Sequence, residues 1–316
     1  MQAPVLPLPK LKISVAQLRQ VLLVAGLLLF TCTCTGSFAQ IKGRVTDAKT
    51  GAPVAYANIQ LENGTGGTTA AEDGTFFLEQ AVTGTTVLVV SSVGYERKSV
   101  RVTTSPLTIA LAPQALTLGE VTVRKPGKVL KRTIGAFRKS AVRSGFGIGS
   151  NNASPWIIAR FFPYHPEYAQ TPYLEKLTFV TRSGIRNARI RLRLLQVTAA
   201  GAPGADLLQV PLIVTVPNGN KAVTINLNEL NVRVPQAGFF VAFEWLLLPG
   251  NRKLETYTTN DGTKKTTFSY EPTLAASLVN SNHHTWIYTG GVWTRSHARH
   301  SDGTYSEPQY RIVLSQ

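Results

Sequence analysis

The chain has 316 residues, 43% of them hydrophobic, and 33 basic against 17 acidic side chains give it a formal net charge of +16. This length favours two domains, each long enough to bury a core of its own. The two cysteines, Cys32 and Cys34, both lie in the first forty residues, so a chain processed after residue 39 has no thiol, disulfide or cysteine nucleophile.

Residues 1–39 have the features of a secretory signal peptide. Three basic residues precede a ten-residue apolar run at 21–30, and the small residues Ser37 and Ala39 stand at the −3 and −1 positions of a cleavage site. Ten apolar residues are too few to span about 30 Å of hydrocarbon, which disfavours the alternative of an uncleaved anchor. We therefore expect cleavage before Gln40, a mature chain without a transmembrane segment, and a location in the periplasm, at the outer membrane or on the cell surface.

Residues 41–123 consist of short alternating runs separated by glycine-rich turns, a pattern typical of a β-sandwich. The runs are 41–46, 54–61, 75–78, 86–92, 97–103 and 107–111. Gly51, Gly74 and Gly94 stand where turns need a permissive φ. Tyr95 is expected to bury its ring and leave its hydroxyl in water.

Several motifs occur in order along this segment. They are Gly43-Arg44-Val45-Thr46-Asp47, Thr50-Gly51-Ala52-Pro53-Val54, Ala57-Asn58-Ile59, Asp73-Gly74-Thr75-Phe76 and Ser92-Val93-Gly94-Tyr95. Together they resemble the carboxypeptidase regulatory-like domain of Gram-negative envelopes. The resemblance implies a seven-stranded transthyretin-like sandwich over residues 40–123, of the kind that often begins TonB-dependent transporters, and residues 118–123 are similar to the segment that closes the domain there.

The rest of the chain disfavours both proteins in which this domain is often found. About 190 residues after position 123 are too few for a plug and a transmembrane barrel. No G-x-S-x-G, P-loop or H-E-x-x-H motif is present, which disfavours a peptidase.

A basic connector is predicted at residues 124–143, where eight basic residues occur without an acid. It is either a solvated linker or a surface that attracts acidic glycans and lipid head groups rather than nucleic acid. Residues 130–137 are alternatively the first strand of the following domain, and residues 145–152 are predicted to form a loop.

Residues 144–316 are predicted to form a second, jelly-roll-like β-sandwich. Its ten candidate strands are 156–162, 173–181, 188–197, 207–216, 222–228, 238–248, 254–257, 266–270, 285–288 and 310–314. The stretches at 188–197, 201–208 and 238–245 loosely resemble carbohydrate-binding jelly rolls, a resemblance that implies sugar recognition.

Two groups of residues are candidates for binding. Arg189, Arg191 and Arg193 alternate with apolar residues, so they share one strand face at a spacing of about 6.7 Å, and their planar groups suit carboxylate, sulfate or phosphate. The alternative is a solvated face paired with Glu244.

Trp286, Tyr288 and Trp293 form the second group, in a predicted hairpin that turns at Gly290-Gly291. Such rings stack on sugars, or they serve only as packing.

The late histidines are His283, His284, His297 and His300, with Asp302 nearby. They match no metal-ligand spacing, so we expect no metal and no cofactor. The sequence thus predicts an exported, non-enzymatic binding or scaffold protein that recognises a glycan, an anionic envelope component or a partner protein. The alternatives are a structural envelope component acting only through protein contacts and, third, a metal-dependent hydrolase.

Overall fold

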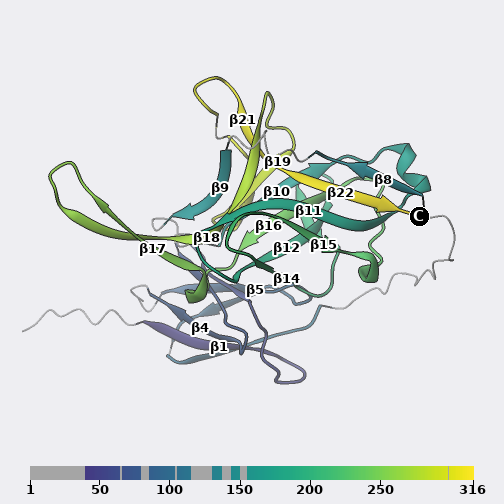
Figure 1. Cartoon of the computed structure of the whole chain (residues 1–316). Helices are drawn as coiled ribbons and strands as arrows, with labels where there is room; N and C mark the ends of the chain where they lie inside the picture. Colours follow the sequence, from purple (N-terminus) through teal and green to yellow (C-terminus); the bar gives the residue numbers. More distant parts are fainter. Residues whose placement is uncertain are drawn as a thin grey trace, which may run out of the picture. The chain divides into compact units, whose positions relative to one another are not determined.

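A computed structural model describes residues 40–64, 66–79, 85–103, 105–114, 130–136, 144–149, 155–297 and 299–316, which form β-strands and short 3-10 helices (Figure 1). The predicted signal peptide, the segment 118–123 and most of the predicted connector lie outside these residues. Within the described ranges, no helix has both the length and the apolar character that crossing a membrane requires.

The N-terminal sandwich is built from seven strands, as predicted. They are β1 (Ile41–Asp47), β2 (Asn58–Leu61), β3 (Gly67–Thr69), β4 (Thr75–Leu78), β5 (Val87–Ser91), β6 (Lys98–Arg101) and β7 (Leu107–Leu111). One sheet has the order β4-β1-β7 and the other β3-β2-β5-β6. Alternate side chains such as Val45, Ile59, Leu88 and Ile109 meet between the sheets and are almost fully buried.

The turns of this sandwich follow the predicted chemistry, with two differences. Gly51 and Gly74 adopt positive φ, as expected. The run predicted to start at residue 54 becomes a strand only at Asn58, because Tyr56 adopts a left-handed φ of 57°. The Tyr95 hydroxyl, expected to be left in water, also donates a hydrogen bond to Asp47 Oδ2 at 3.0 Å, a contact that the sequence did not predict.

The C-terminal sandwich contains strands β8 to β22. The first eight are β8 (Lys131–Ile134), β9 (Ser144–Gly149), β10 (Ile157–Phe162), β11 (Tyr173–Ser183), β12 (Ala188–Val197), β13 (Pro203–Asp206), β14 (Leu212–Val216) and β15 (Gly219–Asn226). The others are β16 (Phe239–Trp245), β17 (Arg252–Thr258), β18 (Lys264–Val279), β19 (Thr285–Thr289), β20 (Val292–Arg295), β21 (Tyr305–Pro308) and β22 (Tyr310–Ser315). Short 3-10 helices occupy Pro166–Gln170, Asn228–Leu230 and Pro249–Asn251.

Two sheets face each other across the core of this second sandwich. One has the order β13-β12-β16-β10-β19-β20, with β14 also paired to β12. The other has the order β17-β18-β11-β22-β8, with β15 paired to β11 and with β9 and β21 paired to β18. Their inner faces supply fully buried side chains such as Phe179, Phe243, Trp245 and Tyr310. The all-β prediction with two sandwiches is thereby confirmed.

Some local predictions for this half are wrong. Residues 145–152 were expected to form a loop, but Ser144–Gly149 is strand β9, which pairs with β18. The strand predicted at 207–216 begins only at Leu212, in β14. Strand β18 runs for 16 residues rather than five, and with β17 it forms a long hairpin that projects from the sandwich (Figure 1).

Candidate functional site

All six candidate binding residues lie on the outer face of the β13-β12-β16-β10-β19-β20 sheet. On β12, Ile190, Leu192 and Leu194 enter the core, so the arginines between them point outward. Two rows of cross-strand partners then run over β12, β16, β10, β19 and β20. The first row is Arg191, Glu244, Ile157, Tyr288 and Trp293, and the second is Arg193, Ala242, Ala159, Trp286 and Arg295.

The arginine end of this face is closed by the N-terminal sandwich. Arg191 is 1% exposed, and its Nη1 lies 3.1 Å from Glu244 Oε1. Its other terminal nitrogen donates to the backbone carbonyl of Tyr56, while the Asn58 amide donates to Glu244. The predicted alternative of pairing with Glu244 is therefore correct, but the pair is buried rather than solvated, because the first sandwich covers it.

Arg189 contributes to the same junction. Its Nη1 donates to the Tyr56 hydroxyl at 2.6 Å and lies 3.3 Å from Glu72. Apolar contacts among Tyr56, Leu246 and Leu248 surround these polar contacts. Arg189 and Arg191 thus both bind the N-terminal sandwich; Arg191 is fully buried, whereas the Arg189 side chain remains 42% exposed.

Arg193 lies between the junction and the aromatic end of the face. Its Nε and Nη2 donate to the two carboxylate oxygens of Asp206 at 2.9 and 2.6 Å, and its Nη1 lies 3.7 Å from Glu244. Burial by itself would lower the pKa of Arg193, but the ion pair with Asp206 outweighs it and raises that pKa. Arg193 is a permanent positive charge that is already largely neutralised.

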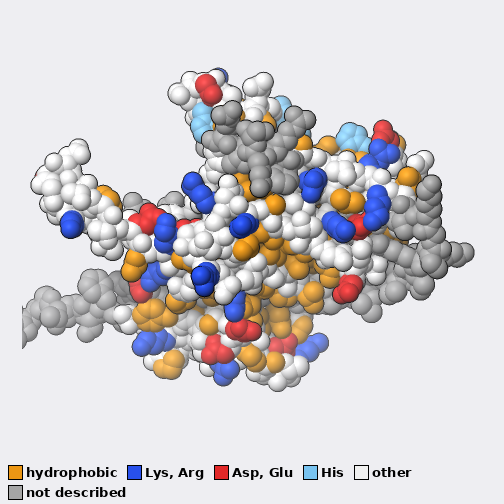
Figure 2. Space-filling model, viewed as in Figure 1, with side chains coloured by type: hydrophobic (Ala, Val, Ile, Leu, Met, Phe, Trp, Pro, Cys, Tyr) orange, Lys and Arg blue, Asp and Glu red, His pale blue; other side chains and the backbone are white. Residues whose placement is uncertain are grey.

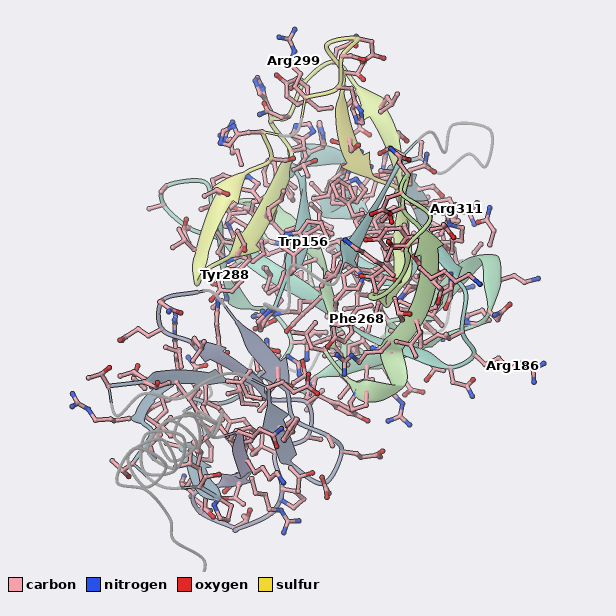
Figure 3. The ribbon with its side chains drawn as sticks, turned by 90° about the vertical axis from the view of Figure 1, so that its left-hand side faces the viewer. Trp156, Arg186, Phe268, Tyr288, Arg299 and Arg311 are labelled. Carbon is pink, nitrogen blue, oxygen red and sulfur yellow. The ribbon has the colours of Figure 1, made fainter. Side chains whose placement is uncertain are left out.

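The aromatic end remains accessible. Trp286, Tyr288 and Trp293 are half-buried, and the ring centroids of Tyr288 and Trp293 lie 5.2 Å apart. The side chains beneath them include Phe240, which is fully buried and meets Trp286 edge-on at 6.3 Å. Figure 3 shows Tyr288 on the β19–β20 hairpin. The packing alternative is therefore partly true, because the three rings pack against the buried residues of the sheet and yet remain only partly buried.

The predicted hairpin is confirmed by the register of β19 and β20, in which Thr289 pairs with Val292. Gly290 and Gly291 both have positive φ, 59° and 84°, as a type I′ turn requires. This turn sets the twist of the hairpin and so brings Tyr288 and Trp293 opposite each other.

Arg295 is a site residue that the sequence analysis missed. Its guanidinium lies over the Trp286 ring, 5.4 Å from the centroid. The alternation of β20 could have identified it, because Arg295 and Trp293 are two residues apart and share a strand face. Phe161, on strand β10, packs on the same cluster of buried residues as Trp286, Tyr288 and Trp293. We call Phe161, Trp286, Tyr288, Trp293 and Arg295 the aromatic face.

Two of the late histidines, His284 and His300, contact polar side chains. Within the ranges that the structure describes, no three His, Cys, Asp or Glu side chains are grouped to hold a metal ion. His284 Nδ1 lies 3.7 Å from Glu307, whose other oxygen is 2.9 Å from Arg160, and His300 Nε2 lies 2.9 Å from the Ser306 hydroxyl.

Comparison with known families supports the sequence-based assignment of the first sandwich. Residues 41–123 match the family model described as the CarboxypepD_reg-like domain, which confirms the resemblance drawn from the ordered motifs. No curated protein matches the chain.

Solved structures resemble the chain only distantly. A candidate carbohydrate-binding protein from Bacteroides uniformis is 11% identical, with a TM-score of 0.20 over 76% of this chain and 98% of its own. A candidate membrane-associated protein of unknown function from Bacteroides fragilis is 13% identical, with a TM-score of 0.20 over 81% and 98%. A structure of the Gt strain of infectious bursal disease virus is 13% identical, with a TM-score of 0.24 over 88% of this chain and 59% of its own. At such scores these likenesses carry no argument about function.

Proposed function

We propose that this chain is an exported, non-enzymatic binding protein whose aromatic face recognises a glycan, with a preference for acidic sugars. The observation that carries the proposal is the joint presentation of Trp286, Tyr288, Trp293 and Arg295 on one face of two paired strands. Export rests on the signal-peptide features of residues 1–39.

The chemistry of these side chains suits a sugar. The apolar C–H faces of a pyranose ring stack on indole and phenol rings, and rings already held by a sheet lose little conformational freedom on binding. Phe240 and the neighbouring strands fix Trp286 from below. A polymer lying along the hairpin would thus find several preformed stacking positions.

Charge gives the preference for an acidic sugar. Among the described residues, no carboxylate lies within ion-pair distance of Arg295, whereas Arg193 is already paired with Asp206. The Arg295 guanidinium is therefore available for a uronate or sulfate group, and its position over Trp286 keeps it beside the stacking surface. Figure 2 shows that other Lys and Arg side chains are scattered over the visible surface rather than gathered in one patch.

Binding of polysaccharides to the mature chain tests the proposal. Alginate serves as the uronate polymer and dextran as the neutral comparison, with affinities measured by titration calorimetry. We expect Trp293→Ala to weaken alginate binding about tenfold or more, which corresponds to about 1.4 kcal/mol. Val292→Ala is the matched control, because Val292 is 60% exposed on the same hairpin and outside the aromatic face. Equal affinities for the wild type and Trp293→Ala, or no binding of any polysaccharide, would contradict it.

A protein partner is the second candidate, and the position of β20 favours it. This strand ends the path of its sheet, so its outer edge offers backbone groups for pairing with another chain. Co-purification with an envelope protein without a polysaccharide signal would support this candidate over the first.

A further inference from the structure

A cavity of about 710 Å³ lies between the two sandwiches. Its N-terminal wall comes from β1, β3, β4 and β7, and its C-terminal wall from Leu247, Pro249, Arg252, Phe268 and Tyr270. Its volume falls within the range of about 300–1,000 Å³ that is typical of small-molecule sites. It shares no residue with the aromatic face, and Figure 3 shows Phe268 and Tyr288 on different strands.

The cavity is mainly apolar. Phe76, Leu107 and Leu247 are among its buried lining residues, and Phe268 and Tyr270 add two rings in edge-to-face contact, with centroids 5.6 Å apart. Phe77 remains 37% exposed although it lies at the cavity. Such a lining favours a ligand with an apolar body over a free sugar or inorganic ion.

Positive charge predominates among the charged lining residues. Among the described lining residues, Lys42, Arg44 and Arg252 stand with a single acid, Glu79. The Lys42 ammonium lies 5.7 Å from the Phe77 ring centroid, so a cation stands directly beside an exposed apolar surface. A ligand that carries an anionic group next to its apolar body would complement this arrangement.

Arg252 identifies where the anionic group would bind. Its guanidinium lies over the Phe268 ring, 4.1 Å from the centroid, which fixes its plane against the wall. Its Nε is buried and has no hydrogen-bond partner among the residues that the structure describes. The nearest acid, Glu79, is 62% exposed and reaches Arg252 Nη1 only at 3.8 Å. The Arg252 side chain is 33% exposed, so its terminal nitrogens can donate to a carboxylate or sulfonate of a ligand, which competes only with this long contact to an exposed acid.

We propose that this cavity binds an anionic amphiphile, a molecule with one acyl chain or flat ring system and one carboxylate or sulfonate head. The apolar body lies against Phe76, Leu107 and Phe268, and the head accepts hydrogen bonds from Arg252. No step of this proposal depends on the glycan site.

Titration calorimetry of the mature chain with dodecanoate below its critical micelle concentration tests the proposal, with 1-anilinonaphthalene-8-sulfonate as the ring-containing probe. We expect saturable one-to-one binding of at least one probe. The affinity for dodecanoate, compared with the affinity for the naphthalene sulfonate, distinguishes an acyl ligand from an aromatic one. Dodecyltrimethylammonium, which has the same tail and the opposite charge, should bind at least tenfold more weakly than dodecanoate.

Two pairs of variants locate the binding. Arg252→Gln should weaken binding of the anionic probe about tenfold or more, whereas Lys253→Gln, a charge lost at the next position of the same strand, should not. Phe77→Ala should also weaken binding, while Leu254→Ala, an exposed residue of β17 that does not line the cavity, should have no effect. Phe77 is partly exposed, so this variant is expected to fold.

The proposal is overturned if neither probe binds with a dissociation constant below roughly 1 mM, which corresponds to a binding free energy of about −4 kcal/mol. It is also overturned if Arg252→Gln and Phe77→Ala both bind as tightly as the wild type, or if the cationic amphiphile binds as well as the anionic one.

Discussion

The guanidinium of Arg191 and the carboxylate of Glu244 lie 3.1 Å apart in a place from which both sandwiches exclude water. Asn58 and the Tyr56 carbonyl, both from the N-terminal sandwich, add hydrogen bonds to this pair, while Arg191 Nε and Glu244 Oε2 have no hydrogen-bond partner among the described residues. The Arg191 guanidinium, predicted to bind an anionic ligand, therefore binds Glu244 and the N-terminal sandwich instead.

Removing one partner of this pair should destabilise the protein strongly. Glu244→Gln leaves the buried Arg191 charge without its counter-ion, and such losses cost about 3–5 kcal/mol. Urea denaturation followed by tryptophan fluorescence measures the change. Glu72→Ala is the control, because its exposed ion pair with Arg189 is worth about 0–1 kcal/mol. Equal effects of the two substitutions would show that the Arg191–Glu244 pair has no special role.

Gly94, of the Gly-Tyr motif, is constrained in two ways that can be separated. Its φ is 81°, and a Cβ there would lie 2.7 Å from the carbonyl oxygen of Gln209, in the other sandwich. Gly51 has a similar φ of 71° but no atom within 4 Å of such a Cβ. Gly51→Ala should therefore show the cost of the backbone conformation alone, about 1 kcal/mol.

Gly94→Ala should cost more than Gly51→Ala, because the junction must also open to admit the methyl group. Denaturant midpoints of the two variants, measured side by side, give the difference. If Gly94→Ala is no worse than Gly51→Ala, the close approach to Gln209 does not contribute to stability.

Asp47 and Tyr95 make stability depend on pH at both ends of the scale. Backbone hydrogen bonds, first from Thr50 and then from Lys49, and the Tyr95 hydroxyl hold the pKa of Asp47 below its usual value. The resulting stabilisation is present above the unfolded pKa of about 3.9 and is lost as the pH falls through the lower folded pKa. Burial, and secondly the hydrogen bond to Asp47, raise the pKa of Tyr95, so that contribution is lost as the pH rises above about 10.

Melting temperatures at pH 7, 3 and 10.5 check this pair. We expect Asp47→Asn to lose less stability than the wild type between pH 7 and pH 3, and Tyr95→Phe to lose less between pH 7 and pH 10.5. If the melting temperatures of both variants depend on pH as the wild type's do, Asp47 and Tyr95 are not the groups responsible.

The sequence predicted the elements of this protein better than their environment. Alternation in residues 188–197 gave both the strand and the side of it that enters the core, because period-two patterning is a local property. The burial of Arg191 could not be predicted in this way, since it depends on Tyr56 and Asn58, which are over 130 residues away along the chain. The cavity beside Arg252 was missed for the same reason, because its two walls belong to different sandwiches.

Glycine content explains the wrong loop prediction at residues 145–152. Gly145, Gly147 and Gly149 look like turn residues, yet in β9 they alternate with Phe146 and Ile148, which are buried in the core. A Cβ on Gly145 would lie 2.8 Å from the Thr273 side chain, so close strand packing rather than a turn accounts for that glycine.

Tyr310 is a buried polar group that should be replaceable. Its hydroxyl has no hydrogen-bond partner in the described part of the chain, and burial raises the pKa of its phenol far above the usual value. Tyr310→Phe removes a desolvated hydroxyl and keeps the ring contacts with Phe162 and Phe179. We expect unchanged or higher stability, by up to about 1–2 kcal/mol, in urea denaturation. A destabilised variant would indicate that the hydroxyl has a partner such as ordered water.

Arg295 supplies the charge of the aromatic face, so its contribution should depend on salt. Arg295→Gln should weaken alginate binding at low ionic strength and make little difference at 1 M salt, where the Debye length shrinks to about 3 Å. Trp293→Ala should weaken binding at both salt concentrations, because stacking does not depend on screening. Titrations of both variants at the two ionic strengths measure the difference.

Arg299→Gln, which removes a charge outside the aromatic face, is the control. If Arg295→Gln and Arg299→Gln have the same effect, alginate responds only to net charge and the aromatic face does not select acidic sugars.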